Sequence, residues 1–356
     1  MKKREKICFI GPYPPPYGGM ALQLKEMVRM LKKEGIEVSF VRTNQEIFKF
    51  FKSLKGIRTF VNFLFFLKAL FKEVPSSTVL YVLGASNLYF FLCVTPSVFL
   101  GKLFKKRVYL NYRGGGPQSF FKRYKPFVSF VMKQTQITVP SEYLKNTIAS
   151  FLGLESQIIP NISYVDIFPF RQRNFLTHRI LCSRNFEKIY NVECVVRAFR
   201  IIKDKYNDAI LGLVGEGSEI KKIKKLVKEL NLEDSTKFYG RLPHKKLPEI
   251  YDKYDVFLNG SDVDNFPASI IEAMASGLLV VSTDAGGIPY ILEDKKTGFL
   301  VKRKDYKSMA EKVISAFENP QNTIEITKRA RKYSERFSWE NVKKTFFEVV
   351  FGELDE

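Results

Sequence analysis

The sequence predicts an α/β protein made of two doubly wound, parallel-sheet domains. Short apolar stretches alternate with helical segments along the whole chain, which is typical of a parallel sheet covered on both faces. The pattern restarts once, after a loop-like stretch at 160–174. The 356 residues, 45% of them hydrophobic, suffice for two cores. We therefore expect domains at 1–171 and 172–338, with a final helix at 339–356 packing back on the first domain.

The first half opens with a strand, a loop, a helix and a second strand. Ile7–Ile10 and Ile36–Val41 are the strands, and the helix begins at Met20. Lysines in its last turn and a following Gly35 are typical of a helix end. Later strands are expected in both halves, at Val79–Leu83, Val108–Tyr112, Ile137–Val139, Ile180–Ser183, Ile210–Val214, Val256–Asn259 and Leu279–Ser282.

Positive charge is concentrated in the first half of the chain. The net charge is +21, and residues 1–170 hold 25 basic against 9 acidic residues, a net of +16. Between Ile47 and Ser141 the only acid is Glu73, against 15 bases interleaved with aromatic residues. Two partners fit such a surface, an anionic membrane or a nucleic acid.

The cysteines and histidines argue against a disulfide framework or a metal centre. The four cysteines lie apart, with no Cys-x-x-Cys spacing, and neither His178 nor His244 has metal-ligand spacing. We expect no metal and no cofactor, and a cytoplasmic location. The longest apolar run, Leu88–Leu100, has 13 residues and contains Pro96, so it is too short to span a bilayer, and we expect no export.

The strongest motif lies at 261–277, directly after a predicted strand. Pro267 suits the first position of a helix and Gly277 suits the residue after its last turn. The amino end of this helix would therefore lie at the carboxyl edge of the sheet, where it favours a diphosphate. Glu272, on the second turn, can accept hydrogen bonds from a ribose diol. The loop and first turn supply further candidate donor contacts, Asn265, Phe266, Pro267, Ala268 and Ser269.

This motif resembles that of the retaining family 4 glycosyltransferases, also called glycosyl transferases group 1. The family mark is two carboxylates separated by seven residues, here Asp264 and Glu272. The resemblance implies the GT-B fold, two Rossmann-like domains facing a cleft. It also implies that Glu272 binds the nucleotide ribose and Asp264 the donor sugar. The family normally has glutamate at the first position, so Asp264 is one methylene shorter. Asp262 and Asp264 also form an Asp-x-Asp sequence, which we interpret as accidental rather than as a metal site.

Further donor contacts follow from the resemblance. It implies that Arg184 clamps the diphosphate, together with a lysine before a Gly-Val pair. Tyr190 stands at that lysine's place, which leaves Lys188 as a displaced candidate. Glycines and their neighbours would supply donor-facing backbone and the nucleobase pocket, at Gly18, Gly19, Gly215, Gly217, Arg241 and Leu242. Gly286 and Gly287 also match the family, which commonly has a glutamate shortly afterwards where Tyr290 stands here.

Acceptor binding is expected in the basic first half. Arg113 and Gly114 follow a strand and precede a helix, so they would face the cleft. Residues 47–72 mix phenylalanines with lysines and arginines, as segments at bilayer interfaces do, and 104–107 and 120–123 would extend that surface. A core helix with solvated lysines is the plainer interpretation of the same pattern.

The sequence therefore predicts a retaining, metal-independent glycosyltransferase that uses a nucleotide-sugar, preferably a UDP-sugar. Its acceptor would be a lipid-linked saccharide at the inner face of the cell membrane, in polysaccharide, lipopolysaccharide or capsule synthesis, and no nucleic acid is expected as partner. The alternatives are a nucleic-acid-binding protein, suggested by charge alone, and a transferase with a soluble acceptor. A dehydrogenase is disfavoured because Gly-x-Gly-x-x-Gly is missing after the first strand.

Overall fold

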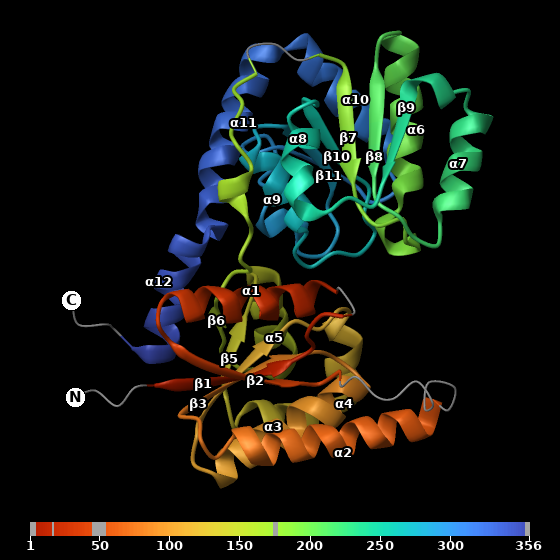
Figure 1. Ribbon diagram of the computed structural model, residues 1–356. Helices are drawn as coiled ribbons and strands as arrows, with labels where there is room; N and C mark the ends of the chain where they lie inside the picture. The colour runs from red at the N-terminus through yellow and green to blue at the C-terminus, as the bar shows by residue number, and fades with distance from the viewer. Residues whose placement is uncertain (1–4, 16–17, 45–54, 174–176, 353–356) are drawn as a thin grey trace. The chain divides into compact units, whose positions relative to one another are not determined.

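The computed structural model describes residues 5–15, 18–44, 55–173 and 177–352. Its two sheets, each of six strands, are entirely parallel and are accompanied by helices (Figure 1). The strand orders are β2-β1-β3-β4-β5-β6 and β12-β11-β10-β7-β8-β9. The predicted fold class, two doubly wound parallel-sheet domains, is confirmed.

The first sheet and its helices come from the first half of the chain. In chain order these elements are β1 (Lys6–Gly11), α1 (Gly19–Lys33), β2 (Glu37–Arg42), α2 (Lys55–Glu73), β3 (Val79–Gly84), the π-helix η2 (Phe90–Val94), α3 (Thr95–Leu103), β4 (Arg107–Tyr112), α4 (Pro117–Met132), β5 (Gln136–Val139), α5 (Glu142–Leu152) and β6 (Gln157–Ile158).

The second sheet and the terminal helices follow. They are η3 (Val165–Ile167), β7 (Arg179–Ser183), η4 (Lys188–Tyr190), α6 (Val192–Lys205), β8 (Ile210–Val214), α7 (Ile220–Glu229), η5 (Glu233–Ser235), β9 (Thr236–Gly240), η6 (His244–Lys246), α8 (Leu247–Tyr251), β10 (Val256–Asn259), α9 (Ala268–Ala275), β11 (Leu279–Thr283), η7 (Ile288–Tyr290), β12 (Phe299–Val301), α10 (Tyr306–Glu318), α11 (Pro320–Ser334), η8 (Glu335–Phe337) and α12 (Trp339–Phe351).

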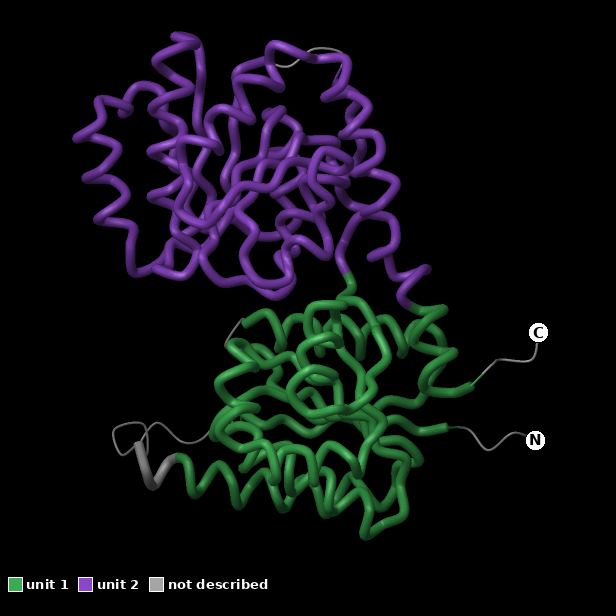
Figure 2. The backbone as a smooth tube through the Cα atoms, turned by 180° about the vertical axis from the view of Figure 1, so that it is seen from behind, with its two compact units in different colours: residues 1–162, 343–356 green, residues 163–342 purple. Residues whose placement is uncertain are grey.

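The chain forms two compact units, which Figure 2 shows in different colours. The first comprises residues 1–162 and 343–356, and the second comprises 163–342. Within the first unit, the Phe346 ring lies 5.4 Å from the Tyr81 ring, and the Tyr109 hydroxyl donates to the Val349 carbonyl at 3.0 Å. The last helix thus adds apolar and hydrogen-bonded contacts to the first sheet.

The central strands are apolar throughout because both faces of each sheet are covered. Every residue of β3 is buried, as is every residue of β10 and β11. Such continuous apolar runs are typical of parallel sheets between helices, and they explain why these strands are recognisable in the sequence.

The three strands absent from the sequence prediction all lie at sheet edges. They are β6, β9 and β12, and β9 reads Thr-Lys-Phe-Tyr-Gly with no fully buried residue. An edge strand covers less apolar surface, so its sequence lacks the continuous apolar pattern. The apolar run at 88–100 folds as the π-helix η2 and most of α3. No helix among the described residues is long and apolar enough to cross a membrane.

A buried arginine anchors the segment that enters the second sheet. The Arg173 guanidinium, 3% exposed, donates to the Asp255 carboxylate at 2.8 Å and to the Ser276 carbonyl at 2.7 Å. Burial lowers the pKa of Arg173 to about 10, which still leaves it charged at neutral pH. The loop-like stretch near 172 is therefore fixed to the second unit by side-chain chemistry, although its sequence has no strand or helix pattern.

Candidate functional site

The motif at 261–277 forms a loop and the helix α9 at the carboxyl end of β10. α9 begins at Ala268, so Pro267 is its N-cap rather than its first residue. Gly277 lies in the left-handed region at φ +79°, just after the last turn, as predicted. The first-turn amides of α9 point out of this end of the helix, since they have no carbonyl partner one turn before them. This arrangement favours an anion at the carboxyl edge of the second sheet.

Glu272 lies on the second turn of α9 and is 6% exposed. One of its oxygens lies 2.8 Å from His244 Nε2, and the other accepts from the Tyr251 hydroxyl at 3.2 Å. Burial, followed by the nearby Glu272 charge, raises the pKa of Tyr251 well above its usual value, so the hydroxyl keeps its proton and donates. Each carboxylate oxygen has two acceptor directions, so a ligand diol can still bind Glu272 beside these partners.

Arg184 follows β7 and contacts three side chains of the second unit. It forms an ion pair with Asp264 and donates to Ser269 Oγ at 3.2 Å. The guanidinium lies over the Tyr190 ring, 4.1 Å from its centroid. Its Nε is buried and has no hydrogen-bond partner among the described residues. A buried N–H donor without a partner is costly, and an anionic ligand would satisfy it.

Asp264 is fixed by contacts on both sides. Besides its ion pair with Arg184, it accepts from the Phe266 amide at 3.0 Å. A side chain at Gly286 would place its Cβ 2.2 Å from the Asp264 carbonyl oxygen, so only glycine fits there. Gly286 and Gly287 therefore hold the loop that carries Asp264. The sequence treats Arg184 and Asp264 as separate contacts, whereas the structure makes them one ion-paired unit.

The two carboxylates of the Asp-x-Asp sequence have different partners. Asp262 lies 3.4 Å from the Asn191 side-chain nitrogen, while Asp264 pairs with Arg184. Within the described ranges, no cluster of three or more histidine, cysteine or acidic side chains has the arrangement of a metal site.

Gly215 and Gly217 pack against the backbone that carries Arg184. A Cβ on Gly215, where φ is +138°, would lie 1.9 Å from the Arg184 carbonyl oxygen. A Cβ on Gly217 would lie 2.4 Å from the Phe186 carbonyl oxygen. These glycines let the loop after β8 lie directly against the end of β7, which helps to position Arg184.

The remaining donor candidates of the second unit lie around this centre. Lys188 is exposed on η4 and lines a cavity of about 350 Å³ with Asp262 and Lys222. Arg241 is exposed and Leu242 half-buried in the loop after β9. Asn265, Phe266 and Ala268 are half-buried around the start of α9. The structure brings Arg184, Asp264 and Ser269 into contact, and it gives Lys188 no contact with them.

The first unit holds the other candidates. Gly18 is the N-cap of α1 and Gly19 its first residue, and apart from chain neighbours and the helix backbone no described residue lies within 4 Å of a Cβ built on either. Arg113 donates to the amide oxygens of Asn111 and Asn161. Burial lowers the pKa of Arg113 to about 10, and no carboxylate pairs with it in the described part of the chain.

The sequence analysis did not identify His244 or Tyr251 as residues of this site. His244 has no metal-ligand spacing, yet its ring contacts Glu272 and lies 4.8 Å from the Tyr164 ring. His244 and Glu272 are 28 residues apart in the chain, so no local sequence pattern indicates that they are in contact.

Comparison with known proteins connects the second unit to a family. Residues 171–336 match the model of the glycosyl transferases group 1. The chain is 32% identical over 171 residues to the N-acetyl-alpha-D-glucosaminyl L-malate synthase of Bacillus anthracis, covering 48% of this chain and 44% of that protein. It is 29% identical over 140 residues to a putative colanic acid biosynthesis glycosyltransferase of Salmonella typhimurium, covering 37% and 34%. The chain thus spans less than half the length of these curated relatives.

The whole fold also has solved counterparts. The structure of HepE from Anabaena in complex with UDP matches with a TM-score of 0.75 at 16% sequence identity, over 98% of this chain and all of that one. At this identity the match establishes a shared fold of two parallel-sheet domains.

Proposed function

This chain belongs to the glycosyl transferases group 1 family through residues 171–336, and on that premise we propose that it is a retaining, metal-independent glycosyltransferase. It takes a sugar from a nucleotide diphosphate donor, preferably a UDP-sugar, and passes it to a membrane-associated, lipid-linked saccharide. The observation that supports this most strongly is the guanidinium of Arg184 beside the amino end of α9, whose buried Nε has no hydrogen-bond partner in the ranges that the structure describes.

Departure of the nucleoside diphosphate builds negative charge on its terminal phosphate. Arg184 and the amide groups of the first turn of α9 are positioned to neutralise that charge without a metal. Glu272 lies within the same helix and accepts hydrogen bonds from the ribose hydroxyls. In the retaining scheme of the family, the acceptor attacks on the face that the leaving group departs from, and a phosphate oxygen takes its proton.

Asp264 has two tasks in this scheme. In the free protein its carboxylate neutralises Arg184. When the donor binds, its diphosphate competes with Asp264 for the guanidinium of Arg184. The Asp264 carboxylate is then available to accept hydrogen bonds from the donor sugar. The hydroxyls of the donor sugar would then supply hydrogen bonds to the carboxylate in place of those from the guanidinium.

A thermal-shift panel tests the donor. With EDTA present, one of UDP, GDP or ADP at about 100 times its dissociation constant should stabilise the protein by ~2.7 kcal/mol, since only the folded site binds it. We expect UDP to give the largest shift and EDTA to leave the shift unchanged. If none of the three raises the melting temperature, the proposed activity is wrong.

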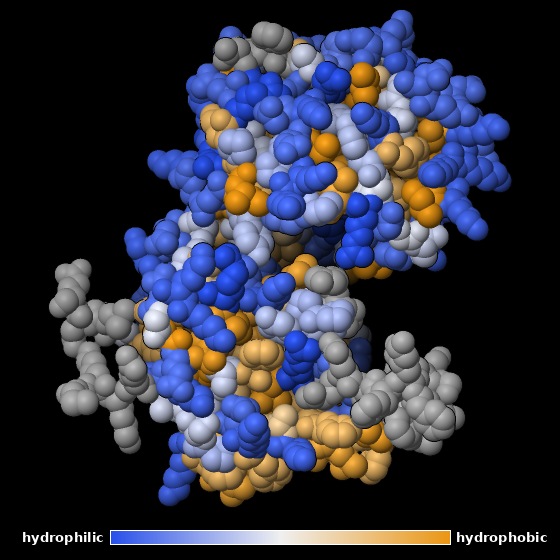
Figure 3. Space-filling model, in the orientation of Figure 1, coloured by the Kyte–Doolittle hydropathy of each residue, from blue (hydrophilic) through white to orange (hydrophobic). Residues whose placement is uncertain are grey.

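A membrane-associated acceptor is supported by the charge and the apolar surface of the first unit. Large side chains on α2 remain exposed, among them Phe60, Phe65 and Phe71, and orange side chains gather over this helix in Figure 3. Lys68 and Lys72 lie exposed on the same helix. Bases near an anionic leaflet contribute about 1 kcal/mol each, and exposed aromatic rings add apolar burial. Of the predicted segment 47–72, residues 47–54 lie outside the described residues.

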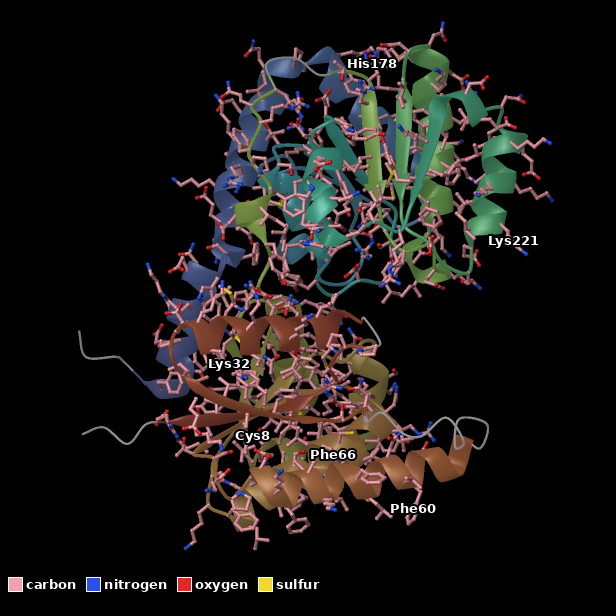
Figure 4. The ribbon with its side chains drawn as sticks, in the orientation of Figure 1. Cys8, Lys32, Phe60, Phe66, His178 and Lys221 are labelled. Carbon is pink, nitrogen blue, oxygen red and sulfur yellow. The ribbon has the colours of Figure 1, made fainter. Side chains whose placement is uncertain are left out.

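Vesicle sedimentation tests this contact. The protein should bind phosphatidylglycerol vesicles much more than phosphatidylcholine vesicles, and raised salt should weaken the binding, because exposed charges are screened beyond about 8 Å at 0.15 M salt. Lys68→Glu with Lys72→Glu should reduce the binding. Lys221→Glu with Lys225→Glu, on α7 of the second unit (Figure 4), removes the same charge and should have little effect. Equal losses in both variants, or salt-sensitive binding to DNA instead of vesicles, would count against a membrane role.

A further inference from the structure

The first unit contains a largely apolar cavity, separate from the donor-site residues described above. Its volume is about 250 Å³, and it lies between α2 and the segment that carries η2. Its apolar lining consists of Phe63, Phe66, Leu88, Tyr89, Leu92 and Cys93. Burial raises the pKa of the Cys93 thiol to about 12, as expected for a group in apolar surroundings.

One helix supplies a wall of the cavity and an exposed apolar surface. Phe63 and Phe66 line the cavity, whereas Phe60 on the same helix does not. Phe60 is 63% exposed, whereas Phe66 is 1% exposed, and Figure 4 shows the two rings on different sides of the helix. The exposed surface of α2 therefore mixes aromatic rings with the exposed Lys68 and Lys72, as helices at bilayer interfaces do. A lipid surface would cover these rings and attract these cations.

The cavity also has a polar side. Asn62 Oδ1 is buried there and has no hydrogen-bond partner within the described part of the chain. Thr43 Oγ1 and the Tyr89 hydroxyl lie 3.2 Å apart at the same cavity. A ligand with a long apolar part and a polar group fits this lining better than a pure hydrocarbon does, because the Asn62 amide offers an acceptor oxygen or, turned over, a donor NH2 to such a group.

The cavity lies at the carboxyl edge of the first sheet, where parallel α/β sheets bind ligands. Thr43 directly follows β2, and Leu88 follows β3 by a few residues. Ser86, two positions before Leu88, has its Oγ 2.7 Å from the Tyr112 hydroxyl. A Cβ on Gly114 would lie 2.4 Å from Ser86 Oγ, so the loop at 113–116 lies directly against this segment. The cavity therefore adjoins the loop predicted to bind the acceptor.

The charge of the residues around the cavity indicates which head group the ligand carries beside its apolar chain. Arg113, in the adjoining loop, is a partly buried cation that donates to the neutral amide oxygens of Asn111 and Asn161. Between residues 47 and 141 only Glu73 is acidic, against 15 bases. An anionic head group is attracted to such a surface, and a second basic protein surface is repelled by it.

We propose that this cavity binds the apolar chain of a lipid whose head group is a phosphate or diphosphate, and that it is the site through which the acceptor lipid is held. The inference rests on the proposed function, since it specifies the acceptor of that reaction. The chain enters between α2 and the segment at 88–93, and the anionic head group lies toward the loop that carries Arg113.

Photo-crosslinking tests the occupant without requiring catalysis. The probe is a single-chain alkyl phosphate with a diazirine near the end of its chain, mixed into phosphatidylglycerol vesicles, and labelled peptides are identified by mass spectrometry. Labels are expected on the residues that line the cavity, namely Asn62, Phe63, Phe66, Leu88, Tyr89, Leu92 and Cys93. Labels confined to the outer side of α2 around Phe60, Leu64 and Phe71, or no labels at all, would overturn the proposal. A diazirine-bearing two-chain phospholipid should label the outer side only, and equal labelling of the cavity by it would contradict a single-chain site.

A matched pair of leucine variants controls for folding and for general surface effects. Leu88 lines the cavity and is 61% exposed, while Leu103 on α3 is 71% exposed and does not line it. Leu88→Glu should reduce the cavity label at least tenfold, because the added charge repels the phosphate and disfavours an apolar chain. Leu103→Glu should leave it within twofold, and equal losses would overturn the proposal. The thermal shift with UDP is measured separately. A shift with UDP but no label in the cavity would contradict the lipid site alone, whereas no shift with UDP would contradict the proposed transferase activity.

Discussion

Arg184→Ala is expected to lower the rate of sugar transfer by about 10²- to 10³-fold, the usual effect of removing one preorganised donor from a developing anion. The loss should be at the upper end of that range. Arg184 is the ion-pair partner of Asp264, so its removal also leaves a partly buried carboxylate facing the diphosphate. Single-turnover kinetics with the nucleotide-sugar would measure the change.

Two further variants separate these contributions. Arg184→Ala combined with Asp264→Asn should recover part of the rate if the orphaned carboxylate contributes to the loss, as a double-mutant cycle would reveal. Arg184→Lys should be intermediate, because an ammonium keeps the charge but not the planar fork of donors. The matched control is Arg179→Ala, at the exposed amino end of the same strand, which should transfer at the normal rate. A fully active Arg184→Ala would contradict the proposed role.

Glu272→Gln is expected to weaken nucleotide binding by about 10- to 100-fold, corresponding to the ~1.5–3 kcal/mol of a hydrogen bond to a charged group. The substitution keeps the size of the side chain in its buried position and removes the charge that the ribose hydroxyls would donate to. It also changes the partner of His244 and Tyr251. Calorimetric titration with UDP would measure the affinity.

His244→Asn distinguishes ribose binding from positioning. If His244 only orients Glu272, its loss should raise the dissociation constant less than Glu272→Gln does, and the double variant should be no weaker than Glu272→Gln alone. Glu249→Gln, at an exposed position of α8, removes a carboxylate elsewhere in the second unit and should bind UDP normally. An unchanged affinity in Glu272→Gln would mean that the ribose lies elsewhere.

The sequence is informative where a residue's role is local. The central strands, the α9 motif and Gly277 follow from apolar runs, spacing and backbone conformation, all of which are local properties. The edge strands β6, β9 and β12 escape this reasoning because half of their surface stays outside the core. The Arg184–Asp264 pair and the His244–Glu272 contact join residues 80 and 28 positions apart, so only the fold brings them together.

Several site assignments remain predictions. Lys188 is exposed beside the 350 Å³ cavity, and apart from chain neighbours and the helix backbone no described residue lies within 4 Å of a Cβ built on Gly18 or Gly19. Gly215 and Gly217 contact the Arg184 and Phe186 backbone, a packing role that their sequence context did not indicate. The small size of these glycines is compatible both with packing against the Arg184 backbone and with contact to the donor, since a loop that lies close to Arg184 also lies close to a ligand bound there.

The central claim is that two side chains bind different parts of the donor nucleotide: Arg184 binds the diphosphate and Glu272 binds the ribose. Calorimetric affinities of UDP and of uridine for three proteins test that division most directly: the unmodified chain, Arg184→Ala and Glu272→Gln. Arg184→Ala should weaken UDP strongly and uridine hardly at all, whereas Glu272→Gln should weaken both by the same factor. If Arg184→Ala weakened uridine as much as UDP, or Glu272→Gln spared uridine, the division would be contradicted.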